Sequence, residues 1–139
     1  MASDPWFFLC HPRVLLVVVG WLIAMPALAA AAGSAGQNGD ADHGQQLYQQ
    51  QCSACHTVDE NDVGPAHRGV YGRKAASLRN FEYSAALRHA NVVWNDETLD
   101  AWLAAPEKFA PGQAMGVSVK DAQARADLIA YLRTLKSAR

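Results

Sequence analysis

Apolar residues of this chain form one unbroken run near the amino terminus and helical stripes further along. Residues 14–25 contain no charged side chain, and residues 27–32 are alanines apart from Leu28. Beyond residue 42, apolar positions recur every three or four residues, which is the spacing of helices that bury one face. No segment alternates apolar and polar residues long enough to indicate a β-strand. The pattern therefore predicts an all-α domain that follows an apolar leader.

The first and last helices of this domain have recognisable starts. Asp42 is the expected cap of the first helix, with Gln45 three residues later in a loose capping box. Gly44 is unusual inside this helix, because a helical glycine costs up to about 1 kcal/mol of helix stability. A close crossing with another helix would explain it. Ser118 with Asp121 opens the last helix, whose predicted buried stripe consists of Ala124, Leu128, Tyr131, Leu132 and Leu135.

Two shorter helices are expected between them. Residues 84–89 fit a helix of little more than one turn. Residues 95–105 fit a longer helix that is capped by Asn95 or Asp96 and ended by Pro106. The rest of the middle segment is rich in glycine and polar residues, so we expect it to form loops.

The amino-terminal residues have the three parts of a secretory signal peptide. Arg13 supplies a positive charge, residues 14–25 the apolar run, and the following alanines a cleavage region, for instance after Ala29. The alternative is a retained membrane anchor, since residues 14–32 are just long enough to span a bilayer. Either interpretation places the domain in the periplasm, free or anchored to the inner membrane. The predicted division is a signal peptide or membrane anchor at 1–32, a flexible linker at 33–41 and a domain at 42–139.

The composition excludes two classes of protein. It also shows that the domain has few large apolar side chains with which to build a core. Twelve lysines and arginines against 13 aspartates and glutamates give a net charge of −1, which argues against a nucleic-acid-binding protein. Three cysteines are too few for a disulfide scaffold. Residues 33–139 contain 46 apolar residues, but 19 of them are alanine. Small domains with so thin a core often need a metal or cofactor to fold.

The sequence Cys52-Ser53-Ala54-Cys55-His56 is the C-x-x-C-H motif of c-type haem attachment. Two thiols at this spacing can each add to one haem vinyl group, and the histidine that follows becomes an axial ligand of the iron. A zinc site would need a second pair of ligands, and the domain has no other cysteine. A disulfide would leave His56 without a role, and a thioredoxin-like redox pair would need alternating strands and helices. We therefore predict one covalently bound haem c.

Met115 is the only methionine after the leader and is the expected second axial ligand. It ends the turn Pro111-Gly112-Gln113-Ala114-Met115 and does not belong to an apolar helical stripe, where a methionine would be a core filler. An electron carrier needs two strong ligands, so that little moves when the iron changes its charge. Histidine together with methionine raises the iron potential relative to two histidines.

Taken in order, these motifs give the chain a strong resemblance to class I cytochrome c, the type shared by mitochondrial carriers and bacterial periplasmic proteins. The resemblance covers about residues 42–135. It implies a small fold of helices and loops wrapped around one covalently attached haem. Besides the haem motif and the methionine turn, the matching positions are Gly44, Tyr48, Gly64-Pro65, residues 69–74, residues 81–84, Trp94, Trp102 and residues 126–132.

The resemblance also implies roles for residues around the haem. Pro65 is expected to accept the second ring hydrogen of His56 through its backbone carbonyl. Trp102 stands where the family has an aromatic residue beside the methionine sulfur. A haem propionate in an apolar pocket needs charge-assisted hydrogen bonds. Its expected partners are Arg73, Tyr83 and Trp94, of which the tryptophan would otherwise be a plain core residue.

The chain departs from the family pattern in two respects. His67 stands where the family has an apolar residue, and three alternatives are open: it points outward, packs as a neutral ring or acts as a replacement ligand. Gln51 and Ala114 stand where mitochondrial members often have lysines. This weakens the basic docking surface around the exposed haem edge and leaves the identity of the redox partner open.

The combined pattern predicts an electron carrier, not an enzyme. The iron would carry one electron between a donor and an acceptor protein that dock at the exposed haem edge, in the brief contacts typical of small redox complexes. The protein is expected to be monomeric. One alternative is a membrane-tethered electron-transfer subunit of an oxidase or dehydrogenase. Another is a haem peroxidase or sensor, which would need an open iron position with an acid–base residue over it.

Overall fold

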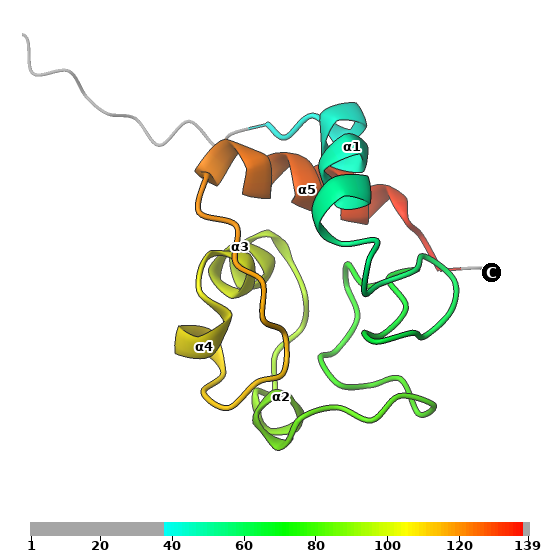
Figure 1. The fold of residues 1–139 in the computed structure, drawn as a ribbon, viewed down its shortest axis with the longest axis vertical. Coiled ribbons are helices and arrows are strands. Elements are labelled where there is room, and N and C mark those ends of the chain that lie inside the picture. Colours follow the sequence, from blue (N-terminus) through cyan, green and yellow to red (C-terminus); the bar gives the residue numbers. More distant parts are fainter. Residues whose placement is uncertain (1–37, 138–139) are drawn as a thin grey trace, which may run out of the picture. The chain divides into compact units, whose positions relative to one another are not determined.

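The computed structural model describes residues 38–137, and in this part of the chain the regular structure is helical (Figure 1). Within these residues Lys74 and Val93 form one isolated antiparallel bridge, and no strand is present. The predicted all-α class is confirmed. The helices in chain order are α1 (Ala41–Gln51), α2 (Ala85–His89), α3 (Asp96–Ala104), α4 (Pro106–Phe109) and α5 (Ala122–Thr134).

Part of the predicted organisation falls outside the described range. The leader at residues 1–32 and residues 33–37 of the linker belong to this part. No helix within residues 38–137 combines the length and hydrophobicity needed to cross a membrane. The division of the chain into leader, linker and domain therefore stays a prediction.

The domain begins with a different helix cap from the one expected, because Asp40 and not Asp42 caps α1. The backbone of Asp40 is extended, and its carboxylate accepts hydrogen bonds from the N–H groups of Asp42 (2.9 Å) and His43 (3.2 Å). The expected capping box of Asp42 with Gln45 is therefore wrong. Asp42 instead adds a negative charge to the first turn, where it interacts favourably with the helix dipole.

Helices α2 and α3 start where the sequence predicts them, whereas α5 is capped by Asp121 and does not start at Ser118. Helix α4 has no counterpart in the prediction. Ser84, Asn95 and Asp121 cap α2, α3 and α5 through side-chain oxygens that accept backbone N–H groups. Asn95 and Thr98 complete a capping box, with both hydrogen bonds at 2.9 Å. Pro106 begins α4 where only the end of α3 is expected, because proline fits the first helical position, whose N–H has no intrahelical partner.

Helices α1 and α5, from the two ends of the described sequence, pack directly against each other (Figure 1). At their crossing, a Cβ atom on Gly44 would overlap the backbone carbonyl oxygen of Asp127 and lie 3.0 Å from Tyr131 Cβ. The close helix crossing predicted at Gly44 is confirmed. Because glycine has no side chain, it lets the two backbones approach this closely, and the packing outweighs its low helix propensity.

We expect Gly44→Ala to destabilise the folded protein by about 3 kcal/mol, although alanine is the better helix former. The added methyl group must push α5 away, because the atom it meets belongs to the backbone and not to a flexible side chain. Chemical denaturation of the haem-loaded protein measures the change. Gln45→Ala, at an exposed position of the same helix, is the control. Equal stabilities of the two variants would contradict the close crossing.

Asp127 on α5 is a buried carboxylate with 2% of its surface exposed. It accepts hydrogen bonds from the Asp40 backbone N–H (2.8 Å) and Gln123 Nε2 (2.8 Å), and it pairs with His43 Nδ1 (2.7 Å). Burial by itself would raise the pKa of this carboxyl, but the hydrogen bonds from these three partners outweigh it and lower the pKa. The ionised side chain therefore ties the start of α1 to α5.

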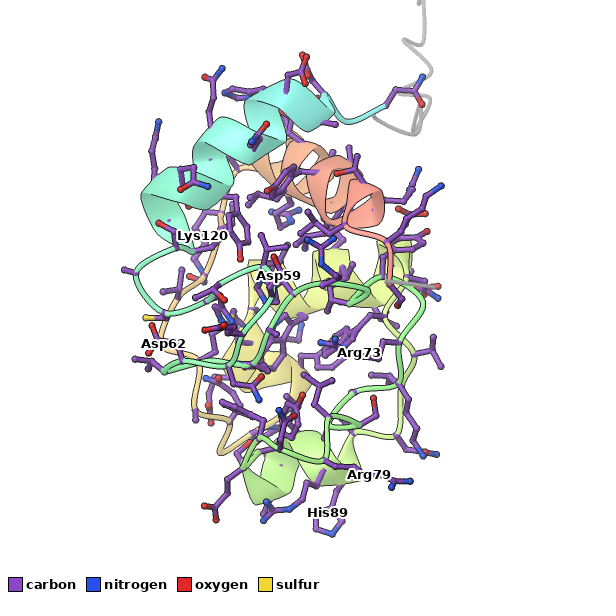
Figure 2. All side chains as sticks on the ribbon, turned by 90° about the vertical axis from the view of Figure 1, so that its right-hand side faces the viewer. Asp59, Asp62, Arg73, Arg79, His89 and Lys120 are labelled. Atoms are coloured by element: carbon purple, nitrogen blue, oxygen red, sulfur yellow. The ribbon has the colours of Figure 1, made fainter. Side chains whose placement is uncertain are left out.

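The folded protein should lose stability in acid through Asp127. Its pKa is lower in the folded than in the unfolded chain. The stability that ionised Asp127 adds to the fold is therefore fully present above the carboxyl's pKa of about 4 in the unfolded chain. It is lost as the pH falls through the pKa of Asp127 in the folded chain. Asp127→Asn should flatten this part of the pH profile of the unfolding free energy, while Asp62→Asn, at an exposed position (Figure 2), should not. A wild-type acid profile in Asp127→Asn would overturn the assignment.

Candidate haem site

A cavity of about 270 Å³ brings together all nine residues to which the sequence assigns a role at the site. They come from the turn and long loop after α1, the segment between α2 and α3, α3 itself and the segment between α4 and α5. Because these segments are far apart in the sequence, the tertiary fold assembles the site. The nine lining residues are Cys52, Cys55, His56, Pro65, Arg73, Tyr83, Trp94, Trp102 and Met115.

The C-x-x-C-H motif forms a tight turn directly after α1. The N–H groups of Cys55 and His56 donate to the carbonyl of Cys52, at 3.0 and 2.9 Å. This turn puts both thiols and the imidazole on the cavity wall. No disulfide joins the two cysteines. Burial, and then the neighbouring Cys55, raises the pKa of Cys52 to about 11, so Cys52 is a neutral thiol at pH 7, unlike the thiolate ligands of zinc.

His56 is held in one orientation and one tautomer. Its Nδ1 lies 2.9 Å from the carbonyl oxygen of Pro65, and since a carbonyl only accepts, Nδ1 carries the hydrogen. Burial lowers the pKa of His56, although the hydrogen bond to Pro65 opposes this. A Cβ atom on Gly64 would lie 2.5 Å from Nδ1 and 2.7 Å from Nε2, so only glycine fits beside the ring. The neutral imidazole keeps the lone pair of Nε2 free to bind a metal.

His67 also lines this cavity, so of its three alternatives the outward orientation is wrong. Its ring stacks on that of His56, with centroids 4.1 Å apart and planes inclined by 17°. His67 Nδ1 lies 3.1 Å from the Tyr48 hydroxyl. Burial, followed by the charges of His56 and Arg73, lowers the pKa of His67 to about 3. The structure therefore shows a neutral, packed ring.

Arg73 is the one lysine or arginine on the cavity lining within the described residues. Its guanidinium donates to the carbonyls of Ala66 (2.9 Å) and Arg68 (3.0 Å), which hold it in place. Burial lowers the pKa of Arg73, an effect that Tyr83 partly opposes. Tyr83 and Trp94 are buried and line the same cavity. A half-buried guanidinium with donors to spare is a suitable partner for an anionic group.

Met115 and Trp102 belong to the wall formed by α3 and the segment before α5. Met115 is partly buried against the core, and its N–H donates to the side-chain oxygen of Gln113. The rings of Trp94, Trp102 and Phe109 form an aromatic cluster with centroids 5.7 to 5.9 Å apart. This cluster supports an apolar wall on which the thioether of Met115 also lies.

The chemistry of this lining fits a haem. Two thiols suit the vinyl groups, a free histidine nitrogen and a thioether suit the iron, and aromatic walls suit the ring. The guanidinium of Arg73 suits a propionate. Within residues 38–137, no group of three or more histidine, cysteine, aspartate or glutamate side chains is placed to hold a metal ion. A porphyrin would therefore have to supply most of the ligands of an iron in this cavity.

Sequence reasoning did not assign two of the residues that contact the histidines. The Tyr48 hydroxyl donates to the backbone carbonyl of His56 at 3.3 Å, and Gly64 makes room for the imidazole. The sequence spacing could have indicated that Tyr48 lies near the haem motif, because Tyr48 stands one helical turn before Cys52 and so on the same face of α1. For Gly64 the signal is its place directly before Pro65.

Comparisons with known proteins identify the class. The family model described as Cytochrome c matches residues 41–136. Cytochrome c of Euglena viridis is 40% identical over 101 residues, which cover 70% of this chain and 99% of that protein. The protein "Cytochrome c-type cyt cy" of Rhodobacter capsulatus is 41% identical over 99 residues, which cover 70% of this chain and 50% of that protein. The solved structure of cytochrome cH from Methylobacterium extorquens is similar with 38% identity and a TM-score of 0.66, covering 69% of this chain and 99% of that one.

The chain therefore belongs to the cytochrome c family and is a class I c-type cytochrome. Members of this family bind one covalently attached haem c with its iron and are electron carriers, not enzymes. The predictions of the family, the cofactor and the electron-transfer function are confirmed. The protein is a single-haem electron carrier between redox partners.

Proposed function

We propose that Cys52 and Cys55 hold the haem through thioether bonds and that His56 and Met115 are the axial ligands of its iron. The observation that carries this proposal is that the turn after α1 and the segment before α5 line one cavity. In each thioether, a thiol adds across a vinyl double bond, and the sulfur and the hydrogen go to its two carbons. The oriented, neutral His56 offers Nε2. When bound, the haem supplies one-electron redox chemistry.

Five further residues make up the proposed haem environment. Pro65 orients the axial imidazole and increases its basicity through the hydrogen bond at Nδ1. Trp102 completes the apolar wall beside the methionine sulfur. A propionate is held by charged and polar donors, because an uncompensated carboxylate is costly in an apolar pocket. These donors are the guanidinium of Arg73, the phenol of Tyr83 and the indole of Trp94.

Redox partners are proposed to dock where the cavity opens to the surface. Val63 and Val117 line the cavity and are 73% and 42% exposed, so they give the rim an apolar part. The exposed Gln51 and Glu82 also line it, and none of the described lysines does. A small rim of this kind supports brief contacts of small area by a monomeric carrier.

Purification of the protein from cells that attach c-type haem tests the attachment and the redox function together. We expect one haem per chain that acidified organic solvent does not extract, and a potentiometric titration that follows a one-electron Nernst curve. Extraction of the haem would contradict the thioether bonds at Cys52 and Cys55. A haem that cannot be reversibly reduced would contradict the carrier function.

Export to the periplasm is the location that residues 1–32 support, through their positive residue, apolar run and alanines. Covalent attachment of c-type haem outside the bacterial cytoplasm agrees with it. The alternative is a carrier anchored to the inner membrane, as a tethered subunit of an oxidase or dehydrogenase. Amino-terminal sequencing of the mature protein decides between them. A start near residue 30 supports the free carrier, and an intact leader supports the anchored form.

A further inference from the structure

The proposed axial ligand His56 is in contact with a second histidine that has no role in haem attachment. The ring of His67 stacks on that of His56, with centroids 4.1 Å apart and planes inclined by 17°. Both rings lie on the wall of the same cavity. A stacked ring restricts the rotation of its neighbour, and this rotation sets the direction of the imidazole plane at a metal.

Tyr48 holds His67 in place and links it to His56 a second time. The Tyr48 hydroxyl lies 3.1 Å from His67 Nδ1 and donates to the backbone carbonyl of His56 at 3.3 Å. A hydroxyl has one hydrogen, so both contacts are hydrogen bonds only when His67 Nδ1 is the donor to Tyr48. The rings of Tyr48 and His67 also pack edge to face, with centroids 5.6 Å apart. The three residues thus form a directed chain of hydrogen bonds.

Tyr48 is buried, with 2% of its surface exposed. Hydrogen bonds that are shielded from water in this way are stronger than those at the surface.

We propose that His67, held by Tyr48, is a positioning residue that sets the orientation of the His56 imidazole and thereby tunes the haem iron. The inference rests on the proposed role of His56 as an axial ligand. Pro65 fixes the tautomer of His56 through Nδ1, and Gly64 leaves just enough room for the ring. Stacking on His67 adds a further restraint on rotation about the Nδ1 hydrogen bond. A polar ring in place of an apolar side chain beside the ligand also favours ferric over ferrous iron, because the ferric state carries one more positive charge.

Two variants, His67→Leu and Tyr48→Phe, prepared as haem-loaded proteins, test this role. Leucine removes the stacked ring and its hydrogen bond, whereas phenylalanine removes only the hydroxyl group. In the ferric protein, the order and spread of the haem methyl proton shifts report the orientations of the two axial ligands, and Met115 is the same in both variants. We expect both variants to change this pattern. We also expect His67→Leu to raise the reduction potential.

His89→Leu is the matched control, because His89 is an exposed histidine at the end of α2, at the outer edge of Figure 2. It should keep the wild-type shifts and potential. A wild-type shift pattern in either His67→Leu or Tyr48→Phe overturns the positioning role, and if His67→Leu does not retain haem, Tyr48→Phe decides alone. If His56 and Met115 are not the iron ligands, the result differs from both of these outcomes, because the wild-type protein itself then lacks the low-spin spectrum of a histidine–methionine iron.

Discussion

Met115→Ala should convert the iron from a closed, six-coordinate site to one that binds external ligands. Alanine has no sulfur, and the described lining of the cavity holds no second methionine. We expect the ferrous variant to bind carbon monoxide rapidly at neutral pH, which the wild type should not do. The reduction potential should fall by on the order of 0.1 V, a fraction of the roughly 0.8 V that axial ligands span, because methionine favours the ferrous state.

Val117→Ala is the matched control for this experiment. Val117 lines the same cavity two residues further along, but it is 42% exposed and carries no ligand atom. Its variant should keep the wild-type potential and stay closed to carbon monoxide. A wild-type potential in Met115→Ala would mean that another group occupies the sixth position. Rapid carbon monoxide binding by the wild type would favour a peroxidase or sensor.

Replacing both Cys52 and Cys55 with alanine should abolish covalent attachment and remove most of the stability of the domain. The haem is then free to leave, and the cavity of about 270 Å³ loses the group that fills it. The total stability of a small domain is only about 5–15 kcal/mol, so we expect the variant to be largely unfolded once its haem is gone. Mass spectrometry of the denatured chain and its helical circular dichroism measure the two effects.

Ser53→Ala is the control, because Ser53 stands between the two cysteines and is exposed, and its hydroxyl donates only to the carbonyl of Gln49 (2.7 Å). It should carry haem and fold as the wild type does. Single replacements of Cys52 or Cys55 should each leave one thioether and an intermediate stability. A double variant whose denatured chain still carries haem would refute the assignment of the two attachment residues.

The chemistry of the site could be predicted because its main residues stand in short motifs. Cys52, Cys55 and His56 lie within five positions, and Met115 is the only methionine of the domain. Helices with side-chain caps could also be predicted from the sequence, since a cap depends on a few neighbouring residues. Their assembly into one cavity depends on the crossing of α1 and α5, for which Gly44 was the one visible sign.

Predictions failed where a distant partner decides between local alternatives. Asp40 and Asp42 both have side chains that can cap a helix. The structure uses Asp40, whose N–H also donates to the buried carboxylate of Asp127. For His67 the sequence left three alternatives open, and its contact with the hydroxyl of Tyr48 turns the ring inward. Pro106 is compatible with both the end of one helix and the start of the next, and the sequence pattern alone does not separate the two.

The absorption spectrum of the ferric wild-type protein at neutral pH tests most directly whether His56 and Met115 ligate one covalently bound haem. We predict a low-spin spectrum with the weak, long-wavelength band of methionine-to-iron charge transfer. The band should disappear in Met115→Ala and remain in Val117→Ala. A wild-type protein without this band at neutral pH, or a Met115→Ala protein that keeps it, would contradict the proposed ligation.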